Sequence, residues 1–192
     1  MAPFSIFFSL FGLLLGLSVA VVVAGFARLL KARPPVNPGW LVPLLGIFVM
    51  LDITSFWNGA WRAREWMIPE YGHLFVGMVV ISIYYLAASL VFPDSAKTTE
   101  DYERHYFAER RRILLAIFFC NAAVFGWQDW LKIHDLPLAW WATVPTYYVL
   151  VLVAAFTPSR RVGIACLAGL IAIYLSHAAI SLFWPAVGQL KV

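Results

Sequence analysis

Apolar residues run through this chain in six long stretches, at about residues 4–30, 41–61, 72–92, 113–131, 138–157 and 162–185. Each is close to the length of roughly 20 apolar residues that a helix needs to cross a bilayer. A lipid interior offers no water to the backbone, so its hydrogen bonds must close within helices. The pattern therefore predicts an all-α polytopic membrane protein, a bundle of six transmembrane helices.

Composition agrees with this pattern, because 62% of the 192 residues are hydrophobic and only 12% are charged. One long connection remains at residues 93–112, and no segment is large enough to fold as a soluble domain. We therefore expect a single domain over residues 1–192.

Within the long connection, Thr98 or Thr99 is suited to cap a short helix, with Tyr102 and Tyr106 on one face. Its Arg110–Arg112 end is expected to contact lipid headgroups.

Basic residues alternate between the two sides of the predicted bundle. Ten of the fourteen Lys and Arg residues follow the first, third and fifth stretches: Arg28, Lys31, Arg33, Lys97, Arg104, Arg110, Arg111, Arg112, Arg160 and Arg161. Cytoplasmic loops of membrane proteins carry such an excess. The rule places loop 93–112 in the cytoplasm and both termini outside. The net charge of +4 is explained by orientation in the membrane, so no nucleic-acid partner is predicted.

Tryptophan gives a second, independent indication of the same orientation. Eight of the nine tryptophans map to the outer side: Trp57, Trp61, Trp66, Trp127, Trp130, Trp140, Trp141 and Trp184. Tryptophan favours the membrane–water interface, where its ring is apolar and its N–H finds a partner. Two roles explain this distribution: the tryptophans anchor the protein in the membrane interface, or they form the wall of an outward-facing aromatic pocket.

Two further patterns concern packing between helices. Gly12, Gly16, Ala20 and Ala24 recur every four residues, so they form one smooth stripe on the first helix. Such a stripe allows close approach of another helix, within the bundle or in a dimer. The pairs Tyr84-Tyr85 and Tyr147-Tyr148 also recur at similar places in two hairpins, through duplication or through chance.

Polar residues inside the predicted spans are costly in lipid, so each suggests a function. They are Asp52, Ser55, Asn121, Gln128 and His177, and all of them fall between mid-membrane and the outer surface. If they converge, they form an outward-facing polar cavity, in which Asp52 is a proton or cation site and His177 its partner. Hydrogen bonding between helices is the structural alternative.

Other chemistry finds little support in the sequence. No nucleophile elbow, phosphate-binding loop, zinc motif or catalytic carboxylate pair is present, so neither catalytic residues nor a metal site are predicted. Cys120 and Cys166 are expected to be small buried hydrophobes. The histidines do not face one another at matching depth, which gives a poor fit to haem ligation. Any cofactor remains unknown from the sequence.

Three segments resemble a family of small six-span bacterial inner-membrane proteins of uncharacterised activity. They are LGLSVAVVVAGFARLLK at 15–31, LVFPD at 90–94 and HYFAERRR at 105–112. The resemblance covers roughly the first 120 residues and implies a bacterial inner membrane, with periplasmic termini under the orientation above. It implies no activity, ligand or site.

The sequence therefore leaves three hypotheses for an integral inner-membrane protein that is not expected to be an enzyme. The first is a small transporter or channel-like protein that uses the polar residues above. The second is a non-catalytic subunit or scaffold that packs against itself or another membrane protein through the Gly12–Ala24 stripe. The third is a haem- or lipid-binding membrane protein. The lipid bilayer is a partner in all three.

Overall fold

The computed structural model describes residues 2–32, 37–62, 71–95, 98–126 and 138–183. In these ranges the fold is all-helical: α1 (Ala2–Lys31), α2 (Leu41–Arg62), α3 (Tyr71–Ser89), α4 (Thr99–Asn121), α6 (Leu138–Phe156) and α7 (Arg160–Phe183). A π-helix, Ala122–Gly126, continues α4. The predicted fold class, all-α, is confirmed.

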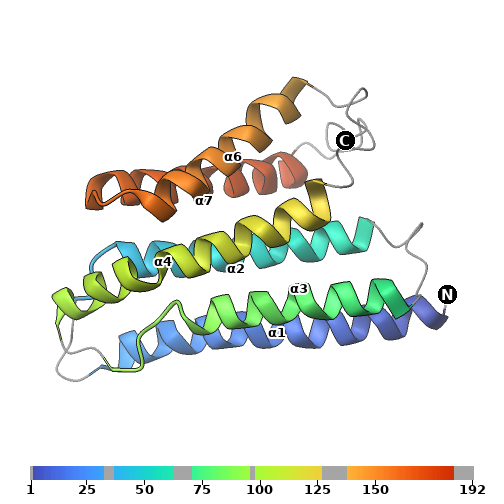
Figure 1. Ribbon diagram of the computed structural model, residues 1–192, viewed down its shortest axis with the longest axis horizontal. Coiled ribbons are helices and arrows are strands. Elements are labelled where there is room, and N and C mark those ends of the chain that lie inside the picture. Colours follow the sequence, from blue (N-terminus) through green and yellow to red (C-terminus); the bar gives the residue numbers. More distant parts are fainter. Residues whose placement is uncertain (1, 33–36, 63–70, 96–97, 127–137, 184–192) are drawn as a thin grey trace.

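The helices form three stacked layers, α1 with α3, α2 with α4, and α6 with α7 (Figure 1). Consecutive helices run in opposite directions, so the ends of α1, α3 and α6 meet the starts of α2, α4 and α7. We call this the basic end of the bundle. Its described basic residues are Arg28, Lys31, Arg104, Arg110, Arg111, Arg112, Arg160 and Arg161.

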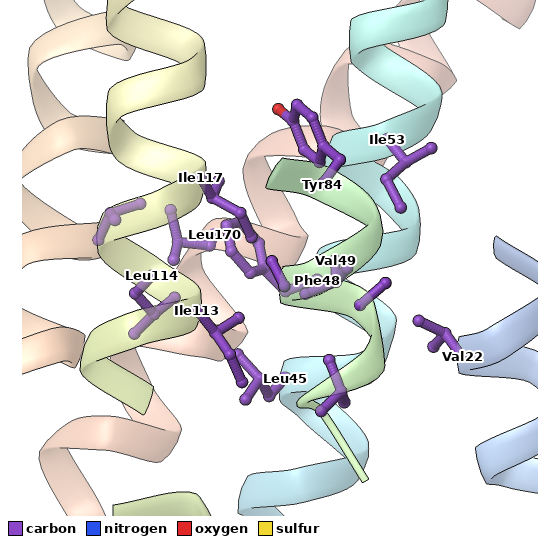
Figure 2. Close-up of a cluster of buried hydrophobic side chains, with 14 of the residues drawn as sticks. Val22, Leu45, Phe48, Val49, Ile53, Tyr84, Ile113, Leu114, Ile117 and Leu170 are labelled. Carbon is purple, nitrogen blue, oxygen red and sulfur yellow. The ribbon is translucent and has the colours of Figure 1, made fainter. Parts of the chain in front are cut away.

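The core lies where the middle layer faces the other two. Figure 2 shows apolar side chains of α2, α3, α4 and α7 meeting in one cluster, including Phe48, Ile113, Leu114, Ile117 and Leu170. Each of these five is at most 1% exposed. On α2 and α4 the buried positions recur every three or four residues, which places them on one helix face.

The outer surface of the bundle is also apolar. Large hydrophobic side chains such as Leu17, Leu86, Val149 and Leu175 are exposed on four different helices. Three helical segments are long and apolar enough to cross a membrane, namely Phe11–Lys31, Leu41–Gly59 and Arg160–Phe183. The apolar parts Leu74–Ser89 and Trp140–Phe156 are shorter. An apolar exterior around an apolar core is what a lipid environment favours.

The connection between the third and fourth predicted stretches differs from the expectation. A separate short helix leaning on the membrane was expected there, but α4 continues without a break from Thr99 to Asn121. Thr98 caps it, because its hydroxyl accepts from the Asp101 N–H and the Asp101 carboxylate accepts from the Thr98 N–H. Arg110 was expected at lipid headgroups, yet it is buried, because it lies on the core-facing side of this longer helix.

The stripe of small residues on α1 divides between two environments. A Cβ at Gly12 would lie 2.5 Å from the Trp57 ring of α2, so this glycine allows the two helices to approach closely. Gly16 has no neighbouring atom within 4 Å of such a Cβ, and Ala20 and Ala24 are exposed. In the described structure only Gly12 therefore packs against a neighbouring helix.

Replacing Gly77 by alanine tests the contact between α1 and α3. The added Cβ would collide with the Phe11 ring, and overpacking of this kind costs about 1–3 kcal/mol. We expect Gly77→Ala to lower the midpoint of thermal unfolding in detergent, followed by tryptophan fluorescence. Gly72→Ala is the matched control on the same helix, because open space surrounds its Cβ position. Equal midpoints in the two variants would contradict this packing.

Candidate functional site

Asp52 lies in the middle of α2 on the face that carries the apolar core. Its neighbours on this face are Phe48, Val49 and Phe56, one turn away on either side, and all are buried. Asp52 itself is 0% exposed. A carboxyl group in such a place must be satisfied by hydrogen bonds, because losing water without compensation is costly.

Three tyrosine hydroxyls donate hydrogen bonds to the Asp52 carboxylate, and each comes from a different helix. Tyr84 of α3 donates to Oδ2 at 2.7 Å, and Tyr147 of α6 donates to Oδ1 at 2.7 Å. Tyr174 of α7 donates to Oδ1 at 2.5 Å. Helices that are distant in the sequence are thus joined at one carboxylate.

Asn121 of α4 completes this cluster. Its amide nitrogen lies 3.2 Å from both Asp52 oxygens, and 3.2 Å and 3.1 Å from the hydroxyl oxygens of Tyr84 and Tyr147. It also lies 3.1 Å from the Ile117 carbonyl oxygen. An amide has two N–H groups, so these acceptors share them. We call Asp52, Tyr84, Asn121, Tyr147 and Tyr174 the carboxylate cluster.

The hydrogen bonds of the carboxylate cluster suit an ionised Asp52. An ionised carboxylate only accepts hydrogen bonds, and the four surrounding groups all have protons to donate. Among the described residues, no Lys, Arg or His forms an ion pair with Asp52. The negative charge is therefore held by neutral dipoles, and a cation that came near would be attracted to it.

A cavity of about 210 Å³, with several polar side chains in its wall, lies against the carboxylate cluster. Its polar lining consists of Ser55, Asn121, Thr143, Tyr147, Tyr148, Tyr174 and His177. Asn121, Tyr147 and Tyr174 belong to both the cavity and the cluster, so they separate Asp52 from the cavity. Since a water molecule occupies about 30 Å³ of liquid, the cavity has room for several waters or a small ligand.

Two helix irregularities border this cavity. The π-helix begins directly after Asn121, and Pro145 lies inside α6, two residues before Tyr147. Proline lacks the N–H that would bond four residues back, and π-helical turns are frequent at functional sites. The carbonyl that loses its partner is that of Trp141, four residues before Pro145, and the Thr146 hydroxyl donates to the next carbonyl oxygen, that of Ala142.

The structure brings together most of the polar residues that the sequence singled out. Asp52 and Asn121 are hydrogen-bonded, and Ser55, Asn121 and His177 line the same cavity. Gln128 lies outside the described residues. His177 was expected to pair with Asp52, but tyrosine hydroxyls and the Asn121 amide occupy the carboxylate, and His177 is exposed.

The sequence did not identify the three tyrosines as partners of Asp52. The recurring tyrosine pairs in the sequence could have indicated these partners, because the first tyrosine of each pair, Tyr84 or Tyr147, is hydrogen-bonded to the carboxylate. Tyr174 lies three residues before His177, on the same face of α7. Tyr174 and Ser55 line the same cavity.

The other candidate sites have less support. Cys120 and Cys166 are buried and free, as expected, and the Cys120 thiol contacts the Val80 carbonyl oxygen. The His105 ring is hydrogen-bonded to the Leu90 carbonyl oxygen at 2.8 Å. Within the part of the chain that the structure describes, no three His, Cys, Asp or Glu side chains come together as a metal site would require.

Comparison with known proteins gives no relative, since no protein-family model, curated protein or solved structure matches this chain.

The contribution of the Tyr84 hydrogen bond to stability can be tested by comparing the same substitution at Tyr84 and at the adjacent Tyr85. Tyr84→Phe removes the hydroxyl but keeps the ring, and a hydrogen bond to a charged group contributes about 1.5–3 kcal/mol. We expect a clear drop in the thermal unfolding midpoint in detergent. Tyr85→Phe is the matched control, because Tyr85 is 39% exposed, and should change the midpoint little. A similar effect of both changes would contradict the special role of Tyr84.

Proposed function

We propose that this chain is a six-span membrane protein whose polar cavity binds a small cation, in the manner of a transporter or channel-like protein. The observation that carries the proposal is Asp52, a fully buried carboxylate that the described residues satisfy with hydrogen-bond donors and no cation. Buried charges in membrane proteins are rare, and they mark ion or substrate pathways.

Helix lengths support six spans rather than three. Both α3 and α6 have 19 residues. At about 1.5 Å per residue this corresponds to roughly 28 Å, close to the hydrocarbon thickness of a bilayer. They also lie alongside the longer helices in the three layers of Figure 1. The span of α4 would begin near Ile113, after its charged first half, and would continue beyond Asn121.

Charge supports an outward-facing cavity. The cavity residues come from the last part of α2, α4 and α7 and the first part of α6, so the cavity lies towards the end opposite the basic end. Under the positive-inside rule, the basic end faces the cytoplasm. The cavity and both termini would then face the periplasm of a bacterium, as the family resemblance implied.

The cavity lining favours an ammonium-type ligand. The hydroxyls of Tyr147 and Tyr174 donate their protons to Asp52, so their oxygens can offer only lone pairs to a ligand. Ser55 and Thr143 add hydroxyl groups to the same wall. Aromatic faces attract cations as well. A small ion with several N–H donors, such as ammonium or a primary amine, matches this surface.

Binding of methylammonium tests this proposal. We expect methylammonium chloride to raise the unfolding midpoint of the purified protein above its value in sodium chloride at equal ionic strength. Asp52→Asn keeps the shape but removes the charge, and we expect it to weaken binding by about tenfold, since the attraction between this charge and a cation on the far side of the tyrosine hydroxyls contributes about 1–2 kcal/mol. Uptake of labelled methylammonium into proteoliposomes at acidic pH, where the permeable neutral amine is scarce, tests transport.

Asp94→Asn is the matched control, because Asp94 is exposed beyond α3 and its change alters the net charge equally. It should behave like the unmodified protein. If the unmodified protein shows no preference for methylammonium over sodium, the ligand class is wrong. If Asp52→Asn binds as tightly as Asp94→Asn, Asp52 does not serve the cavity. Binding without uptake would contradict transport.

A second candidate function is that of a membrane subunit or scaffold. Its support is an apolar groove of about 580 Å³ between α1 and α2, lined by Leu15, Gly16, Val19, Ile53, Thr54, Trp57 and Asn58. Gly16 and the exposed Ala20 and Ala24 give the adjoining face of α1 the small residues that favour helix association in lipid.

Gly16→Leu tests this second candidate. Because nothing lies within 4 Å of the Cβ position, leucine fits in the protomer but blocks close approach of another helix. Under the subunit hypothesis, we expect cross-linked or detergent-stable oligomers to decrease several-fold on electrophoresis. Ala172→Leu, at an exposed position of α7, is the control. Oligomers that are equally abundant in both variants would count against this function.

A further inference from the structure

Arg110 occupies a core position of α4. The buried face of this helix is Tyr102, Tyr106, Arg110, Ile113, Leu114, Ile117, Cys120 and Asn121. Arg110 is 5% exposed, although arginine is almost never buried without a partner. It lies one turn from Tyr106 and close to the basic end of the bundle.

Two of the three guanidinium nitrogens of Arg110 are left without acceptors in the described part of the chain. Its guanidinium carbon lies 4.5 Å from the centre of the Phe107 ring and 6.0 Å from that of Tyr106. Among the described residues, Nε and Nη1 are buried and have no hydrogen-bond partner. The Tyr106 hydroxyl is also buried and unpartnered. A Cβ at Gly163, in the first turn of α7, would lie 3.3 Å from this hydroxyl oxygen.

The nearby carboxylates are already engaged with other arginines. Asp101 pairs with Arg104 at 2.7 Å, Glu109 with Arg112 at 3.0 Å, and Glu103 lies 2.8 Å from Arg160 in an ion pair without good hydrogen-bond alignment. Arg111 lies over the Phe156 ring of α6 instead. No described acidic side chain forms an ion pair with Arg110.

Electrostatics around Arg110 favour an anion. Burial lowers the pKa of its guanidinium; Tyr106 offsets part of this effect, and the positive charge of Arg111 lowers that pKa again. Burial raises the pKa of Tyr106 to about 12, so its hydroxyl stays protonated and can donate. An uncompensated buried cation is strongly unfavourable, and a bound anion would remove this cost.

We infer that Arg110 and Tyr106 form a binding site for a phosphate group at the basic end of the bundle. Guanidinium groups recognise phosphate oxygens through short, charge-assisted hydrogen bonds. The adjacent Arg111 adds a second positive charge, which favours an anion that carries more than one charge or lies in an anionic surface. A phospholipid headgroup and free phosphate share this chemistry.

This site is separate from the carboxylate cluster. Between Arg110 and Asn121 on α4 lie Ile113, Leu114 and Ile117, which pack against apolar residues of α2 and α7 (Figure 2). These three side chains are at most 1% exposed. The phosphate site therefore does not depend on cation binding in the cavity, and either can fail alone.

The experiment measures stabilisation of the purified protein in detergent. The unfolding midpoint is followed with inorganic phosphate against chloride at equal ionic strength, and separately with phosphatidylglycerol against phosphatidylcholine in mixed micelles. We expect one of these anionic probes to raise the midpoint of the unmodified protein. A response to inorganic phosphate identifies free phosphate as a ligand, and a response to phosphatidylglycerol alone identifies the lipid headgroup.

Arg110→Gln should weaken binding of the active probe by at least about tenfold, because the charge-assisted hydrogen bonds are lost. Arg104→Gln is the matched control on the same helix, since the Arg104 side chain is 81% exposed and its loss changes the net charge equally. It should retain the response. Should Arg110→Gln fail to fold, Tyr106→Phe removes one donor and should weaken binding several-fold. No response in the unmodified protein, or an equal response in Arg110→Gln or Tyr106→Phe, would overturn the inference.

Discussion

The structure depends on one constraint, the need to satisfy the carboxylate of Asp52 inside an apolar bundle. A carboxylate away from water is unfavourable unless donors surround it, and here the donors come from α3, α4, α6 and α7. Five of the six described helices therefore meet at one side chain. Because such a cluster is costly when only partly satisfied, it also favours one arrangement of the helices over its alternatives.

Packing around this cluster follows from shape rather than from water exclusion alone. Apolar side chains gain little free energy when they leave lipid for a contact with another helix, because lipid is itself apolar. Close contact between helices must therefore come from complementary surfaces. Gly12 under Trp57 and Gly77 against Phe11 provide such surfaces where α1 meets α2 and α3. Since α1 contributes no residue to the carboxylate cluster, its position rests on this packing.

Two buried charged groups of opposite sign lie at different levels of the bundle. Within the ranges that the structure describes, Asp52 forms no ion pair with a basic side chain and Arg110 forms none with an acidic one. The apolar layer between them, which includes Ile113 and Ile117, prevents them from neutralising each other. The protein thus keeps two buried charges apart, each of which suits a ligand of opposite sign.

The sequence by itself determined the helical class, the position of the described helices other than α4 along the chain, and the placement of basic residues at one end. These follow from local composition, because lipid requires long apolar helices and membrane orientation depends on charges near their ends. It also drew attention to Asp52 and Asn121, because a polar residue in an apolar stretch stands out. Only the tertiary structure decided that three tyrosines bind Asp52 and that Arg110 turns inward. Tyrosine and arginine are common near membrane interfaces, so whether they face lipid or the interior depends on how the helices rotate and pack.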